Sequence, residues 1–394
     1  MLIELRPGTP AEVAEEVAAL TGAHEDVTAW PISLAGRVFV VVSGDESLAR
    51  VPASPAVLAR RPTPDGHWLV RRDSGVAPRE VTIGPPSRSG LPGFGPSRSE
   101  LPGSGPSRSG PSRSGTGWSD AGWSEPRRSG PSAVSPASGR AVEGGVVGGP
   151  RLWWAAGPCA LESAEDAVET ALAVKARGAH ALRAGLSKTR SSPYHFPGKG
   201  RRGLEALAEV RRAAAIPVIT EVCDPREVEA VAEVADCLQV DGRQLDNRPL
   251  LAELGAQPRP VLLMRGPRAS LDDWLRAAEF VLTRGNAAVV LCAGAWGTPP
   301  QPGFGAIAAL RARTDLPVVF DPSHSTGSAS LVAPASLAAS AYGADGLLIE
   351  SCLKPGKMYR PGDAAHMFPP ESLADLVAAC ERARDSARSL AVPR

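Results

Sequence analysis

The feature that most constrains the fold is a row of eight short apolar runs in residues 149–394 of this 394-residue chain. A helix-like segment follows each run. The runs, in order, are "LWWAAG", "ALRAG", "PVITEV", "CLQVDG", "PVLLMRG", "AAVVLCAG", "PVVFDPS" and "GLLIES". Runs of this kind, apolar on both alternating faces, are typical of parallel strands buried on both sides.

The number of these strand–helix units and their combined length match a (β/α)8 barrel. A doubly wound open sheet is the alternative arrangement for alternating strands and helices. No Gly-rich dinucleotide-binding fingerprint follows the first run, and this favours the barrel. We therefore predict an α/β protein in which residues 149–394 form a TIM barrel.

The segment 1–84 carries a different pattern, with elements that predict the order βαββαβ. They are "LIELRP" (strand), "PAEVAEEVAALTG" (helix), "VTAWPIS" and "RVFVVVSG" (a hairpin), "DESLARVP" (a short helix) and "HWLVRR" (the last strand). This order is typical of a small ferredoxin-like α+β domain. Such a domain could bind a small-molecule effector in a regulatory role, and a packing appendage is the alternative.

Between these two parts, residues 85–148 repeat "PSRSG" at positions 86, 106 and 111. The tract has too few apolar residues to bury a core, which predicts a disordered linker rich in Gly, Pro, Ser and Arg. Its arginines could touch RNA or an acidic surface, but a solvated linker is the favoured interpretation.

The overall composition predicts a cytoplasmic protein without nucleic-acid or membrane partners. The net charge is +1, and no apolar run reaches the roughly 18 residues that a membrane span needs. Met1 leads directly into "LIELRPG", which is not a signal-peptide pattern. The six cysteines have neither disulfide-like nor zinc-like spacing, which favours a reducing compartment.

Candidate site residues follow from the barrel prediction, because active sites of such barrels lie at the carboxyl ends of the strands. The polar residues just past the apolar runs are Cys159, Arg183, Lys188, Arg190, Glu221, Arg243, Arg265, Asp321, His324, Glu350 and Asp363. Among them we assign candidate catalytic roles to Lys188, Glu221 and Asp321.

Four of these residues form a candidate metal site: Cys159, His324, Glu350 and Asp363. Imidazole and carboxylate ligands suit Mn, Fe, Co or Zn, and one thiolate favours the softer metals. Taken singly, each residue has a structural alternative. Cys159 could be a small buried apolar residue, and His324 could cap a loop.

Five cations at the same rim form a candidate anion site: Arg183, Lys188, Arg190, Arg243 and Arg265. Clustered cations of this kind bind phosphate or carboxylate. Arg183 and Arg243 follow closely on apolar strand residues, where a charge needs a partner. Surface solvation accounts for most arginines and lysines elsewhere in the chain.

Together the motifs "AGPCALES", "LRAGLSKTRSSPYHFPGKG", "PVITEVCDPREVE", "LQVDGRQLDN" and "DPSHSTG" resemble a known family. It is the type I 3-deoxy-D-arabino-heptulosonate 7-phosphate (DAHP) synthases, in the subgroup related to 3-deoxy-octulosonate 8-phosphate synthases. The resemblance covers residues 150–388. Residues 1–84 also resemble the ferredoxin-like regulatory domain of some members, and 85–148 resembles an insertion.

The resemblance implies a metal-dependent, aldol-type condensation of phosphoenolpyruvate with erythrose 4-phosphate. It gives DAHP and phosphate, opens the shikimate pathway and uses small phosphorylated substrates. The family's divalent-metal ligands map onto Cys159, His324, Glu350 and Asp363. Its phosphoenolpyruvate contacts map onto Arg183, Lys188 and Arg243, and its aldose-phosphate contacts onto Arg190, Ser191 and Ser192. It also implies a homo-oligomer, a dimer or tetramer.

Three positions depart from the family pattern. Met264 stands where a lysine is usual, Asp241 where a glycine is usual, and 291–300 holds no cation where the family has an arginine. Replacement cations are sought in the long loop after Glu350 and after Gly266: Lys354, Lys357, Arg360 and Arg268. The alternatives to a working synthase are a relative with a changed substrate in a specialised pathway, and a non-catalytic relative that binds a metabolite or partner.

Overall fold

The computed structural model describes residues 1–44, 46–61, 68–74, 79–84, 145–190, 194–266, 268–294, 303–358 and 364–390. Within these ranges, no helix combines the length and the apolar character that crossing a membrane would require.

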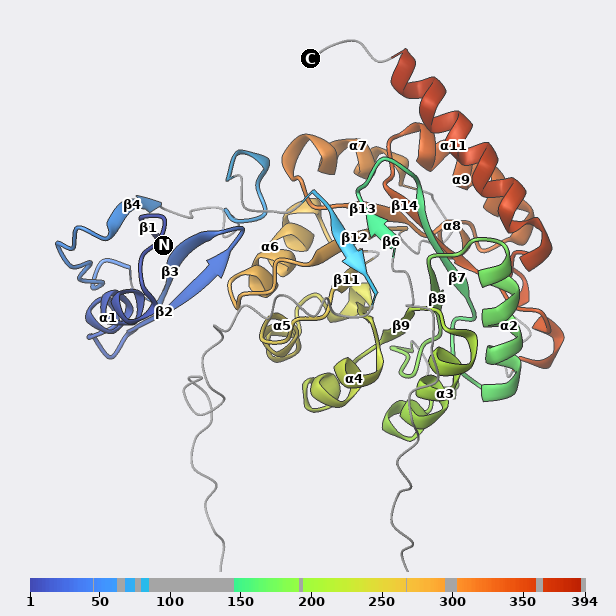
Figure 1. Ribbon diagram of the computed structural model, residues 1–394, viewed down its shortest axis with the longest axis horizontal. Coiled ribbons are helices and arrows are strands. Elements are labelled where there is room, and N and C mark those ends of the chain that lie inside the picture. Colours follow the sequence, from blue (N-terminus) through green and yellow to red (C-terminus); the bar gives the residue numbers. More distant parts are fainter. Residues whose placement is uncertain are drawn as a thin grey trace, which may run out of the picture. The chain divides into compact units, whose positions relative to one another are not determined.

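Eight parallel strands close into a barrel in the order β10-β11-β12-β13-β14-β7-β8-β9 (Figure 1). They are β7 (Trp153–Gly157), β8 (Ala181–Arg183), β9 (Val218–Glu221), β10 (Cys237–Val240), β11 (Val261–Met264), β12 (Val289–Ala293), β13 (Val318–Phe320) and β14 (Gly346–Glu350). The last strand pairs with the first, Glu350 opposite Gly157. This pairing confirms the barrel and excludes the doubly wound alternative.

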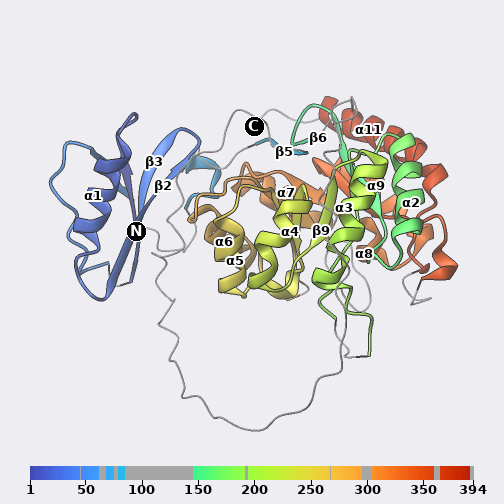
Figure 2. The same cartoon turned by 60° about the horizontal axis from the view of Figure 1, so that its bottom comes forward.

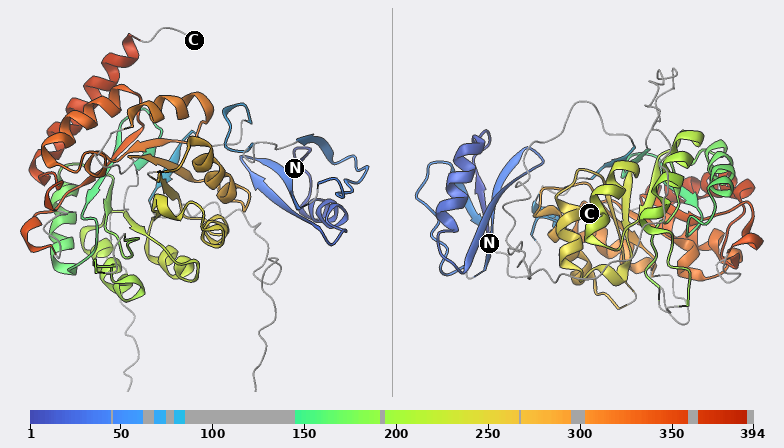
Figure 3. Two further views of the ribbon diagram at one scale, coloured as in Figure 1. Left: turned by 180° about the vertical axis from the view of Figure 1, so that it is seen from behind. Right: turned by 90° about the horizontal axis from the view of Figure 1, so that it is seen from below.

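Helices follow the strands in sequence, and most of them cover the outside of the barrel (Figure 3). They are α2 (Ala164–Ala176), α3 (Leu204–Ala214), α4 (Val228–Val234), α5 (Arg248–Gly255), α6 (Leu271–Leu282), α7 (Phe304–Arg313), α8 (Pro322–Thr326), α9 (Ala329–Ala341) and α11 (Leu373–Ser389). Several begin at residues that satisfy the free N–H groups of a first turn. Ser163 caps α2, and Ser270 with Asp273 forms a capping box on α6.

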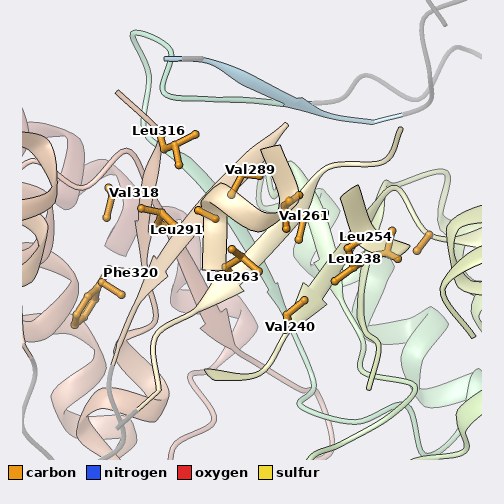
Figure 4. Close-up of a cluster of buried hydrophobic side chains, with 14 of the residues drawn as sticks. Leu238, Val240, Leu254, Val261, Leu263, Val289, Leu291, Leu316, Val318 and Phe320 are labelled. Carbon is orange, nitrogen blue, oxygen red and sulfur yellow. The ribbon is translucent and has the colours of Figure 1, made fainter. Parts of the chain in front are cut away.

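Successive side chains of each barrel strand point alternately toward the surrounding helices and into the barrel interior. Val261 and Leu263 of β11 belong to the cluster that packs against the helices (Figure 4). Leu262 and Met264 of the same strand belong to the inner cluster. Both faces of the strand are therefore buried, which explains why the runs are apolar throughout.

A short antiparallel pair, β5 (Val81–Ile83) and β6 (Gly145–Val147), packs at the strand starts of the barrel (Figure 2). Val81, Ile83 and Val147 join the inner cluster beside Trp153. The predicted linker therefore needs a correction at its end, because residues 145–147 of the tract 85–148 form a strand. A three-residue strand leaves too short a pattern to detect. Residues 85–144 lie outside the described residues.

The N-terminal segment forms a sheet of order β2-β3-β1-β4, in which all pairs are antiparallel. The strands are β1 (Leu2–Leu5), β2 (Val27–Leu34), β3 (Arg37–Gly44) and β4 (Val57–Arg61). Helix α1 (Ala11–Thr21) buries Val17 and Ala18 against Ile3 and Val40 on one face. This confirms the predicted ferredoxin-like strand order.

Two predicted elements of this segment are wrong. Residues 46–48 of "DESLARVP" form a turn and not a helix, and the last strand is Val57–Arg61 instead of "HWLVRR". In the latter, residues 69–71 turn and Arg72–Ser74 forms a 3₁₀ turn. Strand β4 is at the edge of the sheet and half exposed, so its sequence is too polar to show the pattern of a buried strand.

Candidate metal and substrate site

Three of the predicted metal ligands meet at the carboxyl ends of neighbouring strands. Cys159 follows β7, His324 lies in α8 directly after β13, and Glu350 ends β14. The Cys159 Sγ lies 3.7 Å from His324 Nε2, which lies 3.0 Å from Glu350 Oε1. All three side chains are buried, and their donor atoms lie within 4.8 Å of one another. Asp363, the fourth predicted ligand, lies outside the described residues.

Asp321 fixes the orientation of the His324 ring. Its Oδ1 accepts the backbone N–H of His324 at 2.9 Å as the cap of α8, and its Oδ2 lies 2.5 Å from His324 Nδ1. The ring therefore presents Nε2 to Cys159 and Glu350. A carboxylate on the far nitrogen is the usual partner of a metal-binding histidine. Burial alone would lower the pKa of His324, but the Asp321 and Glu350 charges raise it well above its ordinary value.

Glu350 is ionised although it is fully buried. Arg183 donates from Nη2 to Glu350 Oε1 at 2.6 Å. Burial alone would raise the pKa of Glu350, but His324 and Arg183 hold it well below its ordinary value. A metal ligand must be deprotonated, and this carboxylate already meets that condition.

The donor set fits a divalent transition metal. Thiolate, imidazole and carboxylate together suit Mn, Fe, Co or Zn. The carboxylate of Glu350 is fully buried. A cation beside it would compensate a buried charge that is otherwise costly.

Two cations lie beside this cluster. Arg183 ends β8 with 1% of its surface exposed, and its Nε and Nη1 have no hydrogen-bond partner among the described residues. Lys188 donates from Nζ to Glu221 Oε2 at 2.6 Å. Burial alone would lower the pKa of Lys188, but the charges of Cys159 and Glu221 raise it. Both cations therefore stay charged in a buried place, which suits an anionic substrate.

Glu221 organises the loop that carries Lys188. Besides the lysine, it accepts the backbone N–H of Thr189 at 3.0 Å. Gln239, which points into the barrel from β10, approaches the same carboxylate at 3.5 Å. Glu221 thus acts in this structure as the partner of a cation and of a backbone amide.

The profile of the DAHP synthetase I family matches residues 140–383. This chain belongs to that family. A member from Thermotoga maritima, "Phospho-2-dehydro-3-deoxyheptonate aldolase", is 37% identical over 212 residues, covering 52% of this chain and 63% of that relative. A "2-dehydro-3-deoxyphosphooctonate aldolase" from Nitratidesulfovibrio vulgaris is 32% identical over 232 residues, covering 51% of this chain and 81% of its own length.

Solved structures agree with this family assignment. A crystal structure of the Thermotoga maritima DAHP synthase has a TM-score of 0.61 and 25% identity, covering 98% of this chain and 97% of that one. A truncated form of the Thermotoga maritima enzyme has a TM-score of 0.55 and 31% identity, covering 61% and 89%.

In this DAHP synthetase I family member, Arg243 forms an ion pair with Asp241, two residues before it. Asp241 Oδ1 accepts from Arg243 Nε, and Oδ2 accepts from Nη2, both at 2.8 Å. Met264 is 4% exposed, and its sulfur accepts from Gln239 Nε2 at 3.2 Å. Arg243 is therefore paired with a carboxylate, and Met264 presents a thioether and no charge.

Other predicted substrate residues are not seen to converge on this site. Arg265 donates to the Ala269 carbonyl of its own loop at 3.1–3.2 Å, and Arg190 donates to the Phe196 carbonyl at 2.8 Å. Lys354, considered as a replacement cation, binds Asp166 at 2.8 Å and also Glu169 on α2. Ser191, Ser192, Arg360 and residues 295–302 lie outside the described residues.

One residue at the site escaped the sequence analysis. His366 is buried, and its Nε2 contacts Glu350 Oε2. It does not follow a strand directly, so the search for polar residues at strand ends could not find it. A search for every histidine near the predicted fourth ligand would have raised it as a candidate.

Proposed function

We propose that this protein condenses phosphoenolpyruvate with erythrose 4-phosphate to give DAHP and phosphate. The observation that carries the proposal is the buried pair of cations, Arg183 and Lys188, set beside the cluster of Cys159, His324 and Glu350. The family membership and the similarity to a heptonate aldolase support the same reaction.

The proposed reaction joins the two substrates and consumes one water as phosphate is released. Carbon 3 of phosphoenolpyruvate forms a bond to the aldehyde carbon, and the aldehyde oxygen takes a proton. Water adds its oxygen at carbon 2 and gives up one proton. The carbon–oxygen bond to phosphate then breaks as the new hydroxyl becomes the ketone and passes its proton to the departing phosphate. A divalent metal, when bound, supplies Lewis-acid polarisation of the acceptor carbonyl. We expect Cys159, His324 and Glu350 to hold it.

The roles of the chain's own residues follow from their contacts. Arg183 offers Nε and Nη1 to the donor's carboxylate or phosphate, while its Nη2 remains on Glu350. Lys188 keeps its proton at Nζ against Glu221, so this pair can deliver a proton to the developing hydroxyl and recover one from the added water. Asp321 acts through His324, whose ring it orients.

We also propose a cytoplasmic location, a homo-oligomer and an effector site in residues 1–84. The location is supported by the cysteine spacing and the lack of a signal-peptide pattern. The homo-oligomer is supported by the resemblance of the barrel to the family, and the effector site by the ferredoxin-like domain. A shift in the metal-dependent rate on adding an aromatic amino acid, absent after removal of residues 1–84, would support the effector site.

The test is release of phosphate from phosphoenolpyruvate and erythrose 4-phosphate with Mn²⁺ present and with a chelator as control. Arabinose 5-phosphate replaces erythrose 4-phosphate in a second arm, because several relatives are octonate aldolases. We expect metal-dependent release with erythrose 4-phosphate and its loss in Arg183→Ala. Folded, metal-loaded protein that releases no phosphate would contradict the proposal and favour a changed donor substrate.

A further inference from the structure

A pocket of about 260 Å³ lies between the N-terminal sheet and the last turn of α6. Helix α6 starts after the carboxyl end of β11 and ends before β12 begins, so its last turn lies at the opposite end of the barrel from the candidate metal and substrate site. Both walls contribute apolar and aromatic surface. The residues that matter here are Leu2, Trp30 and Val41 on the sheet and Phe280, Thr283 and Arg284 on the helix side.

Hydrogen bonds hold the two walls of this pocket together. Trp30 Nε1 donates to the Thr283 carbonyl at 2.8 Å. The buried carboxylate of Glu279 on α6 accepts the backbone N–H groups of residues 68–70 at 2.8–2.9 Å. The pocket is therefore already shaped in the folded chain, which lowers the ordering cost that a ligand would meet on binding.

Arg284 brings a positive charge without an acidic partner to the pocket. The side chain is half-buried, and its guanidinium carbon lies 4.7 Å from the centroid of the Trp30 ring. Among the described residues, this guanidinium makes no hydrogen bond or ion pair. Burial holds the pKa of Arg284 below its ordinary value, although the charge of Glu253 opposes this effect. A second guanidinium, that of Arg248, lies 4.0 Å from the centroid of the Phe280 ring.

The pocket offers no comparable partner to a positive group. The only acid among the described residues that line it is Glu279, whose carboxylate already accepts from residues 68–70. The carbonyls at the end of α6 also accept hydrogen bonds already; they belong to Glu279, Phe280, Val281 and Leu282. A ligand ammonium would therefore meet the repulsion of Arg284 and find no anion to compensate it.

We propose that this pocket binds a small aromatic carboxylate that carries no ammonium group. The ring would lie against Trp30 and Phe280, and the carboxylate would pair with Arg284. Arginine suits this role because it stacks on aromatic rings and binds carboxylates through two parallel hydrogen bonds. The volume is below the roughly 300–1,000 Å³ of sites for drug-sized ligands, so a single ring with a short chain fits best. This site goes beyond the proposed reaction and needs none of its substrates.

The test is calorimetric titration of the full-length protein with 3-phenylpropanoate. Two matched compounds separate the contributions: 3-phenylpropanamide keeps the ring and chain without the charge, and phenylalanine adds an ammonium group. We expect one binding event per chain for 3-phenylpropanoate. Binding of either matched compound should be about ten-fold weaker or more, the usual effect of losing a hydrogen bond to a charged group.

Variants place the ligand in the pocket. Arg284→Gln should weaken binding of 3-phenylpropanoate about ten-fold or more. Phe280→Ala should weaken it about two- to ten-fold, the range for an aromatic pair, and should stay folded because Phe280 is 39% exposed. The matched control is Arg276→Gln, since Arg276 lies on the same helix and pairs with Asp273 at 3.0 Å. It should bind like the wild type, and thermal unfolding confirms that each variant is folded.

Four outcomes would overturn the inference. They are no binding of 3-phenylpropanoate to the folded wild type, equal binding in Arg284→Gln, equal or tighter binding of phenylalanine, and displacement of the ligand by phosphoenolpyruvate. The last would place the ligand at Arg183 and Lys188 instead. None of these titrations measures phosphate release, so failure of this site and failure of the proposed reaction are told apart.

Discussion

At the scale of single residues, Asp241 changes what Arg243 can do. Burial alone would raise the pKa of Asp241, but its bonds from Arg243 hold it below the ordinary value, so it is ionised at neutral pH. Arg243 in turn has its Nε and Nη2 committed to this carboxylate. If Arg243 binds the donor substrate, as the resemblance implies, that anion would have to compete with a fixed negative charge for the same guanidinium.

We predict that Asp241→Asn strengthens phosphoenolpyruvate binding. Removing the competing charge should lower the KM or the calorimetric Kd by about ten-fold, which corresponds to ~1.4 kcal/mol. Asp224→Asn is the control, because Asp224 holds Arg226 with the same spacing and the same side-chain and backbone bonds on the surface. An unchanged or weaker affinity in Asp241→Asn would show that the pair positions Arg243 for the substrate instead of competing with it.

At the scale of secondary-structure elements, Glu4 links three strands of the N-terminal sheet. From β1 it accepts from Arg37 Nε of β3 at 3.0 Å and from Arg61 Nε of β4 at 2.7 Å. Burial alone would raise the pKa of Glu4, but the two arginines lower it below the ordinary value. Such a group adds stability above its unfolded pKa, and that stability is lost as the pH falls through the lower, folded pKa.

We therefore predict that Glu4→Gln lowers the free energy of opening of this sheet at pH 7. The expected loss is about 1–3 kcal/mol, the usual range for hydrogen bonds to charged groups. Hydrogen exchange followed by mass spectrometry over β1, β3 and β4 measures the change. After correction for intrinsic exchange rates, the difference should shrink as the pH falls below the ordinary Glu pKa of about 4.3. The variant and the wild type should converge only below the lowered pKa of the folded state, where Glu4 is protonated in both states. Glu15→Gln, on the exposed side of α1, is the control, and an equal effect there would refute the explanation.

The β5 and β6 strands allow another prediction at this scale. Ile83 and Gly145 are directly paired at the end of an antiparallel ladder, so the two ends of the intervening chain meet. Replacing residues 84–144 by Asn-Gly should give an ordinary two-residue hairpin and leave the barrel folded. Thermal unfolding and phosphate release should stay within error of the full chain. A drop in soluble, folded protein would mean that the replaced tract contributes to the core.

At the scale of the whole molecule, the candidate metal site lies where the barrel closes. Its ligands come from β7, from α8 after β13, and from β14, and β14 with β7 is the pair that joins the two ends of the barrel sequence. A cation bound there would cross-link the loop after β7 to the residues that follow β13 and end β14. Metal binding should therefore be linked to global stability and not only to turnover.

We predict that Mn²⁺ at 100 times its Kd stabilises the folded chain by about 2.7 kcal/mol, which raises the Tm, and that a chelator reverses the shift. Cys159→Ala should abolish this increment because the thiolate ligand is gone. Cys380→Ala, a buried cysteine on α11, should keep it even if its own Tm is lower. An equal metal-induced shift in Cys159→Ala would contradict the assignment of Cys159 as a ligand.

Much of this architecture could be predicted because each apolar run carries its own signal. A strand buried on both faces must be apolar throughout, so all eight barrel strands were found, and with them the rim residues Cys159, His324 and Glu350. The edge strand β4 and the three-residue strands β5 and β6 were missed. Their burial depends on partners distant in sequence, and so they leave little local pattern.

The amino-acid sequence by itself determined the barrel, the ferredoxin-like strand order and the rim residues Cys159, His324 and Glu350, because periodicity and strand ends are local properties of the chain. Only the tertiary structure decided which partner each charge takes: Arg243 with Asp241, Lys354 with α2, and His366 with Glu350. Pairing of this kind depends on distances of a few ångströms between residues that the sequence can separate widely. Composition and spacing do not encode such distances.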